Sequence, residues 1–338
     1  MNLLMTTPAP PGTRYGNRVT ALRWVKILKS LGHRVTLSTQ MPAAAGAPAP
    51  FDALVALHAG RGHEAIRGFR QTHPGKPLVV ALTGTDLYRD IQQDPRVVES
   101  LGWADRIITL HGLADQALPE PLRPKVRLIL QSAPPPSPAV DALRRKAQAR
   151  WSGPGGGQKR FTVCVVGHLR EEKDPFRAAM AAREMVPSSG LRVIHAGRAM
   201  NDEMAQRALD EMARNPRYRW VGELPPWRVR RLMASSRLMV LSSRLEGGAN
   251  VISEAAALGL PVLASRIAGS VGLLGENYMG YFPPVDTRGL AKLLRRGEMD
   301  PRYLAGLAHW MRDLAPMFHP DREKSAWQAL LDELTPRI

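Results

Sequence analysis

The chain has little of several features that would assign it to a particular class of protein. A single cysteine, Cys164, stands among 338 residues, so no disulfide forms within the chain and we expect a reducing, cytoplasmic setting. No apolar run approaches the ~20 residues that a membrane-spanning helix requires. The apolar run at the N-terminus is too short for a secretion signal. We therefore expect no stable membrane insertion.

Two kinds of ligand site are also missing from the sequence pattern. The histidines do not follow the spacing of metal ligands, so we expect no bound metal. We expect instead that His58, His111 and His195 occupy positions in the core or in the wall of the cleft. The turn after the first strand has Gly12 and Gly16 in G-x-x-x-G rather than G-x-G-x-x-G, which argues against a dinucleotide oxidoreductase.

The charge of the chain is strongly positive. Its 47 basic residues against 30 acidic ones give a formal net charge of +17. This charge favours nucleic acid, anionic lipid or small phosphorylated ligands. A nucleic-acid-binding protein is one alternative, and it would lose affinity steeply with salt. The seven tryptophans, however, do not interleave with basic runs as single-strand binding favours. We expect small-molecule substrates and no nucleic acid; the oligomeric state stays open.

Short apolar strands alternate with amphipathic helices in two blocks. This alternation predicts parallel sheets, and thus two Rossmann-like α/β domains. Ligands of such sheets bind beyond the carboxyl ends of the strands, and two facing domains would form a cleft. The strands that we expect are 2–7, 33–39, 52–58, 77–83, 105–110 and 125–130, then 161–167, 191–196, 218–222, 238–242 and 261–264.

A break separates the two blocks. Ala133–Pro138 reads APPPSP and Ser152–Gly157 reads SGPGGG, and such runs do not continue a helix or a central strand. We expect an N-terminal domain over residues 1–150, a C-terminal domain over residues 158–315 and a final segment over residues 316–338 that contains a helix at Pro320–Leu334.

One stretch, Arg244–Ser265 (RLEGGANVISEAAALGLPVLAS), suggests an anion site. Gly247 and Gly248 permit a close approach of the backbone to a ligand. Asn250 and Val251 are expected to open a helix, whose free N–H groups suit a diphosphate. The alternative is a surface helix with ordinary capping.

Two carboxylates flank that helix start. Glu254 lies about one turn into the helix, where it could accept hydrogen bonds from two vicinal hydroxyls such as those of a ribose. Glu246, eight residues earlier, could reach a sugar hydroxyl on the other side of the diphosphate. The pair therefore suits a nucleotide sugar.

Cationic side chains follow the first strand of the second block, in VGHLREEKDP. Gly167 ends the strand, and His168, Arg170 and Lys173 follow it. A lysine there could neutralise a leaving diphosphate. The alternative is a solvated loop whose charges are balanced by Glu171 and Glu172.

A second candidate anion site follows the first strand of the first block. The N–H groups and side chains of GTRYGNR could cradle an anion there, although a turn with a helix cap is the alternative. Thr83 and Thr85 add hydroxyls after a neighbouring strand, and Asp86 is the candidate if a general base is required. The cradle consists of Gly12, Arg14, Gly16, Asn17 and Arg18.

These motifs resemble those of glycosyltransferase family 4. Glu246 and Glu254 match its E-x7-E signature, and VGHLREEKD resembles its VGRLxxEKG. The resemblance implies a GT-B fold, with two Rossmann-like domains facing across a cleft and a nucleotide-sugar donor on the second domain. It implies no obligatory metal or other cofactor, and a last helix that packs back on the first domain. It assigns the ribose to Glu254, the donor sugar to Glu246 and phosphate to Lys173.

The sequence departs from the family at three places. His168 stands where the family has a phosphate-binding arginine, and Thr83 stands where many members have a histidine. Gln131–Ser132 replaces the usual NG after the last strand of the first domain. The acceptor side is therefore atypical.

A narrower resemblance covers those atypical segments. TTPAPPGTRYGNRVTALRW, LTGTDLYRDI, VGHLREEKDPF and SRLEGGANVISEA resemble the selenosugar synthases of selenoneine biosynthesis. This resemblance implies transfer of a sugar from UDP-N-acetylglucosamine or UDP-glucose to the selenium of selenophosphate, followed by loss of phosphate. The alternative is an ordinary family 4 glycosyltransferase with a carbohydrate or lipid acceptor.

Overall fold

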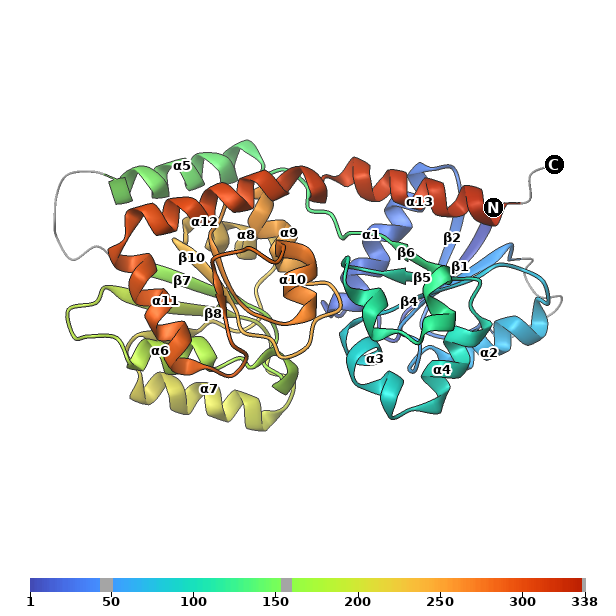
Figure 1. The fold of residues 1–338 in the computed structure, drawn as a ribbon, viewed down its shortest axis with the longest axis horizontal. Helices are drawn as coiled ribbons and strands as arrows, with labels where there is room; N and C mark the ends of the chain where they lie inside the picture. The colour runs from blue at the N-terminus through green and yellow to red at the C-terminus, as the bar shows by residue number, and fades with distance from the viewer. Residues whose placement is uncertain (43–50, 153–159, 336–338) are drawn as a thin grey trace. The chain divides into compact units, whose positions relative to one another are not determined.

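Two parallel sheets organise the residues that the computed structural model describes, which are 1–42, 51–152 and 160–335 (Figure 1). The chain divides into two units, and each has one of the sheets. Unit 1 contains Met1–Ser132, Glu246–Asn250 and Pro320–Ile338, and unit 2 contains Ala133–Leu245 and Val251–His319. Two Rossmann-like α/β units were predicted from the alternation of strands and helices, and this fold class is confirmed.

The sheet of unit 1 has six parallel strands in the order β2-β1-β3-β4-β5-β6. The strands are β1 (Asn2–Thr6), β2 (Arg34–Ser38), β3 (Ala53–Leu57), β4 (Leu78–Ala81), β5 (Arg106–Thr109) and β6 (Val126–Leu128). The helices are α1 (Gly16–Ser30), α2 (His63–Thr72), α3 (Gly84–Tyr88), α4 (Pro95–Trp103) and α13 (Pro320–Leu334), with 3₁₀ turns at Asp90–Gln92, Ala114–Ala117 and Glu120–Lys125.

Alternate residues of β1 supply the two cores of unit 1, because successive side chains of a strand point to opposite faces. Leu4 packs in the core that includes residues of α2 and α4. Leu3 and Met5 pack in the other core, with residues of α1 and α13. In that core the rings of Trp24 and Trp327 meet edge to face, with centroids 4.9 Å apart. The last helix of the chain thus belongs to the unit formed by the first 132 residues.

The sheet of unit 2 has six parallel strands in the order β12-β11-β10-β7-β8-β9. The strands are β7 (Phe161–Val166), β8 (Leu191–Ala196), β9 (Tyr218–Trp220), β10 (Leu238–Leu241), β11 (Val262–Ser265) and β12 (Tyr281–Phe282). The helices are α5 (Pro138–Ser152), α6 (Arg177–Arg183), α7 (Asp202–Arg214), α8 (Pro226–Ser235), α9 (Asn250–Ala257), α10 (Ala268–Leu274), α11 (Thr287–Met299) and α12 (Pro301–Leu314), with 3₁₀ turns at Glu171–Lys173 and Ala315–Phe318.

The single cysteine lies in the middle of β7 and is fully buried. Burial raises the pKa of the Cys164 thiol to about 12, since the apolar surroundings disfavour the thiolate. Cys164 is therefore a small core residue and not a nucleophile.

The boundary between the units lies earlier than the sequence predicted. Residues 133–150 were expected in the N-terminal domain, but they group with unit 2. The buried Arg144 of α5 explains this, because it donates to the carbonyl oxygens of Ser236 (2.6 Å) and Gly259 (3.2 Å). The glycine-rich stretch from residue 153 and the expected domain start at residue 158 lie outside the described residues. Residues 316–319 group with unit 2, and α13 has its predicted bounds.

In each sheet there are two neighbouring strands whose connections run to opposite sides of the sheet. The place between these two strands is the topological switch point. In unit 2 this point lies between β7 and β10, and in unit 1 it lies between β1 and β3. Ligands of doubly wound sheets bind at the carboxyl ends of the strands at such a point. We therefore expect a functional site in the loops that follow these four strands.

Candidate functional site

The two predicted loops of unit 2 meet at its switch point. Ser242, directly after β10, donates its hydroxyl to the carbonyl oxygens of Lys173 (3.2 Å) and Asp174 (2.9 Å). The backbone N–H of Arg244 donates to the carbonyl oxygen of Glu172 at 2.8 Å. The structure thus brings the loop after β7 against the turn after β10, which sequence spacing alone does not show.

Lys173 ends a short 3₁₀ turn, and the chain changes direction directly after it. Asp174 has a φ of 44°, in the left-handed region, and its carboxylate binds the Arg177 guanidinium at 2.7 Å. Both side chains of this ion pair are buried. Because Ser242 and Arg177 both hold the turn, the backbone that carries Lys173 is fixed in position.

The other predicted residues of this loop have local partners. Gly167 accepts a hydrogen bond from His195 Nε2 at 3.1 Å, and burial lowers the pKa of His195 to about 4, which keeps this side chain neutral. His168 Nδ1 accepts from the backbone N–H of Arg198 at 3.1 Å. The guanidinium of Arg170 lies 4.0 Å from the carboxylate of Glu172 and is 40% exposed. Arg170 is therefore a partly exposed cation beside a carboxylate.

A glycine that the sequence analysis did not single out makes this loop possible. A Cβ at Gly197, after β8, would stand 1.8 Å from the carbonyl oxygen of Gly167. The ends of β7 and β8 can therefore meet only with glycine at this position.

We expect Gly197→Ala to lower the free energy of unfolding by about 3 kcal/mol or more, because the methyl group displaces the backbone at Gly167. Denaturant unfolding monitored by circular dichroism measures it. Gly306→Ala is the matched control, since its Cβ would meet only Met279 at ordinary contact distance inside α12. Equal stability of the two variants would contradict the account.

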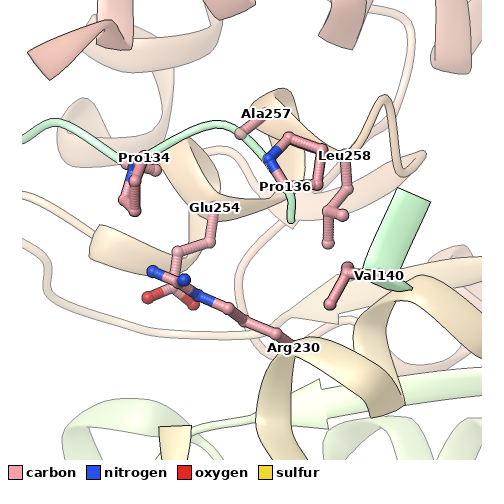
Figure 2. A pocket seen from close by; sticks show the side chains of 8 residues that line it. Pro134, Pro136, Val140, Arg230, Glu254, Ala257 and Leu258 are labelled. Carbon is pink, nitrogen blue, oxygen red and sulfur yellow. The ribbon is translucent and has the colours of Figure 1, made fainter. Parts of the chain in front are cut away.

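Glu254 lies in α9 and lines a hollow of unit 2 (Figure 2). Its carboxylate and the guanidinium of Arg230, from α8, point toward one another in that view. Sequence analysis missed Arg230, which is one of nine arginines between residues 201 and 250 and has no distinguishing motif. The other residues lining the hollow are Ala133, Pro134, Pro136, Val140, Ala257 and Leu258. Val251 lies in the first turn of α9 and is partly exposed.

The segment Glu246–Asn250 groups with unit 1, although its neighbours along the chain belong to unit 2. A Cβ at Gly247 would stand 2.3 Å from the Thr83 carbonyl carbon, and one at Gly248 would stand 2.4 Å from Leu110 Cβ. Both glycines are therefore required by packing against the protein itself, and their approach to a ligand stays a prediction. Glu246 is 6% exposed.

Asn250, the first residue of α9, is held by a partly buried network of unit 1. Its Oδ1 accepts from Arg23 Nη1 at 2.9 Å, and Arg23 Nε lies 3.0 Å from the Glu323 carboxylate. Glu323 is 2% exposed and also accepts from Trp24 Nε1 (2.7 Å) and from the backbone N–H of Ser132 (3.0 Å). Sequence analysis missed this network, because its members are far apart in the chain and show no motif.

The predicted anion cradle follows β1 at the switch point of unit 1. Gly12 has a φ of 79°, and Thr13 donates its hydroxyl to the carbonyl oxygen of Pro10 at 2.7 Å. Gly16, Asn17 and Arg18 are the first three residues of the 15-residue helix α1. Their N–H groups are thus the helix-terminal donors that the sequence predicted. Arg14 is exposed.

Asp86 does not fit the role of general base. It is fully buried, and its carboxylate accepts from the backbone N–H groups of Thr83 (2.7 Å) and Ala59 (2.9 Å) and from the Thr83 hydroxyl (2.7 Å). These bonds cap α3 and join the ends of β3 and β4. We therefore assign Asp86 a structural role, and the Thr83 hydroxyl proton is engaged with it.

We expect Asp86→Asn to lower the free energy of unfolding by about 1–3 kcal/mol, since an amide N–H₂ would face a backbone N–H. Urea unfolding measures the difference against Asp332→Asn, whose exposed side chain accepts from Gln328 on α13. An unchanged stability combined with a large loss of kcat would instead restore Asp86 as a base.

Two further features are absent from the described residues. No cluster of three or more histidine, cysteine, aspartate or glutamate side chains there could hold a metal ion. None of the helices in the described ranges has the length and apolar character needed to cross a bilayer.

Similarity to known proteins extends over both units. Residues 153–305 match the family described as glycosyl transferases group 1. No curated protein matches the chain significantly.

Three of the solved structures that share its architecture show how far the similarity extends. HepE from Anabaena, solved with UDP and glucose, has a TM-score of 0.75 at 17% identity, covering 98% of this chain and 100% of its own. Sucrose-phosphate synthase from Thermosynechococcus elongatus has a TM-score of 0.76 at 16% identity, covering 98% of both chains. A glycosyltransferase from Rickettsia africae has a TM-score of 0.72 at 13% identity, also covering 98% of both. The chain thus has the GT-B fold, and residues 153–305 match the glycosyl transferases group 1 family.

Proposed function

We propose that this protein transfers a sugar from a UDP-sugar. The observation that carries the proposal is the meeting of the loop after β7 with the turn after β10, at the switch point of the unit that matches the glycosyltransferase family. Support for uridine as the nucleoside comes from the similar HepE structures, which are described as complexes with UDP and with UDP-glucose.

Each donor residue has a distinct proposed task. The Glu254 carboxylate accepts hydrogen bonds from the two ribose hydroxyls, and the first turn of α9, Asn250 and Val251, offers N–H groups to the diphosphate. Lys173 neutralises the charge that develops on the diphosphate as the bond to the sugar breaks. Glu246 binds a hydroxyl of the transferred sugar. Gly167, His168 and Arg170 form the rest of the loop around the diphosphate.

For the acceptor we propose selenophosphate. The support is the resemblance of four sequence segments to selenosugar synthases, together with the first turn of α1, where N–H groups, Arg14, Asn17 and Arg18 suit a small multiply charged anion. Such an acceptor also fits the loss of Asp86 as a base, because the selenium of selenophosphate is already anionic and needs no deprotonation.

The proposed reaction balances without a redox partner. A selenium lone pair forms the C–Se bond at the anomeric carbon, and the C–O bond to the diphosphate breaks, with its electron pair leaving on UDP. Water then cleaves the P–Se bond of the Se-glycosyl selenophosphate, giving inorganic phosphate and the 1-selenosugar.

The test is the rate of UDP release from UDP-N-acetylglucosamine and from UDP-glucose with a panel of acceptors. The panel contains selenophosphate, thiophosphate, inorganic phosphate, glucose and a lipid-vesicle preparation, with water alone as the blank. We expect selenophosphate to accelerate release above every other arm. Acceleration by glucose or by vesicles, with none by selenophosphate, would support the ordinary family 4 alternative and overturn the proposed acceptor.

A further inference from the structure

His58 stands directly after β3, at the switch point of unit 1, in an unusual conformation. Its φ is 74°, in the left-handed region, and its side chain is buried. A buried non-glycine residue in this region is strained, and such strain is concentrated at functional sites. A core or wall position, as predicted for this histidine, does not require such a conformation.

The surrounding turn holds the backbone of His58 in place. The carbonyl oxygen of His58 accepts from the N–H of Gly62 at 2.9 Å, and the next residue, Ala59, donates its N–H to the Asp86 carboxylate at 2.9 Å. A Cβ at Gly62 would stand 2.7 Å from that same carbonyl oxygen, so the turn requires glycine there. The strained backbone is thus held by the turn after β3 and by Asp86 of α3, which follows β4.

The ring of His58 has a defined tautomer. Its Nδ1 accepts from the backbone N–H of Arg61 at 3.2 Å, so the proton of the neutral ring is on Nε2. Burial lowers the pKa of His58 and keeps the ring neutral. The carboxylates of Asp86 and Asp90, 3.7 and 3.9 Å from the ring nitrogens, raise this pKa but do not outweigh burial. The charges of Arg61 and Arg89 lower the pKa further.

The proton on Nε2 is directed at Thr85, whose Oγ1 lies 3.1 Å away. Since the Thr85 oxygen accepts this bond, its own hydroxyl proton is available to donate to another group. Thr83 differs in this respect, because its hydroxyl proton goes to Asp86. Of the two threonines predicted to bind the acceptor, Thr85 is therefore the one poised to donate.

We propose that His58 is a positioning residue that orients the Thr85 hydroxyl as a hydrogen-bond donor to the anionic acceptor. The inference rests on the proposed function in one respect, namely that Thr85 contacts the acceptor. It extends that function by assigning a task to a residue outside the glycosyltransferase motifs and outside the domain that matches the family.

A double-mutant cycle tests the pairing. His58→Asn keeps a residue that tolerates left-handed backbone, and Thr85→Val removes the hydroxyl at nearly constant shape. We expect each single variant to raise the KM for selenophosphate about 10-fold, as expected for a hydrogen bond to a charged group, with the KM for the UDP-sugar unchanged. In the Thr85→Val background, His58→Asn should cause no further change, and Thr85→Ser should stay close to wild type. Equal factors for His58→Asn in both backgrounds, or an unchanged KM in Thr85→Val, would overturn the inference.

A second measurement does not depend on turnover. Two-bond ¹H–¹⁵N spectra of the full-length protein report the tautomer of His58, with His58→Asn identifying its signals. We expect a protonated Nε2 and a bare Nδ1, and a shift of the Nε2 signal when inorganic phosphate is added. A proton on Nδ1 would overturn the positioning role whatever the protein's activity. If the spectrum is as expected but the protein does not use selenophosphate, the proposed acceptor is wrong and the positioning role of His58 is not overturned.

Discussion

Replacing Glu254 by alanine is expected to weaken binding of UDP by about 100-fold. Its carboxylate is proposed to accept two hydrogen bonds from the ribose, and bonds to a charged group contribute about 1.5–3 kcal/mol each. Part of this loss of binding free energy is offset when water solvates the freed ribose hydroxyls. A net loss of about 2.7 kcal/mol corresponds to a 100-fold higher dissociation constant. Isothermal titration calorimetry with UDP measures the change without any assumption about the acceptor.

Two companion variants make the Glu254 result specific. Glu254→Gln keeps one acceptor oxygen, so its affinity should fall between wild type and alanine. Glu276→Ala removes an exposed carboxylate of unit 2 that pairs with Arg266, and it should bind UDP as wild type does. If Glu254→Ala and Glu276→Ala bound UDP equally well, Glu254 would not hold the ribose.

Lys173→Ala is expected to lower kcat by about 100- to 1,000-fold, which is the effect of removing one group that stabilises charge developing in a transition state. The affinity for the UDP-sugar should change far less, because the diphosphate gains negative charge only as the glycosidic bond breaks. Steady-state UDP release at saturating donor, together with calorimetry, separates the two quantities.

Two control variants separate the effect of a cation at position 173 from the effect of the overall charge of the protein. Lys173→Arg retains a cation on a backbone held by Ser242, so it should recover part of the lost kcat. Lys292→Ala removes an exposed lysine of α11 and should leave kcat unchanged. A wild-type kcat in Lys173→Ala would remove this side chain from the leaving-group site.

The repeating architecture was predictable because it is carried by local patterns. Strand β8 and helix α13 have the predicted bounds, Leu191–Ala196 and Pro320–Leu334. Apolar runs identify buried parallel strands, and periodic apolar residues identify helices that cover them. No element was predicted between Arg266 and Asp300, where the structure has α10, β12 and α11; β12, with two residues, is too short to leave a pattern.

Contacts between distant residues were not predictable in the same way. The role of Asp86 depends on Ala59, which lies 27 residues earlier, and no spacing rule joins them. The same holds for Gly247, where a Cβ would clash with the backbone of Thr83. Sequence analysis could recognise these residues as special, but it could not identify the contacts within the protein that require them.

The large excess of arginine has a partly structural explanation. Arg144 is 4% and Arg177 is 7% exposed, and both bind backbone or side-chain oxygens. Arg23 joins α1 to Asn250 and to Glu323. The net charge of +17 therefore overstates the number of cations available to a substrate.

The most direct test of the proposed function is the mass of the product. The full-length protein is incubated with UDP-N-acetylglucosamine and selenophosphate, and the mixture is analysed by mass spectrometry. The account predicts a sugar product with the isotope pattern of selenium, formed in amounts equal to the UDP released and absent when selenophosphate is omitted. Release of UDP without any selenium-containing sugar, with either UDP-N-acetylglucosamine or UDP-glucose as donor, would contradict it.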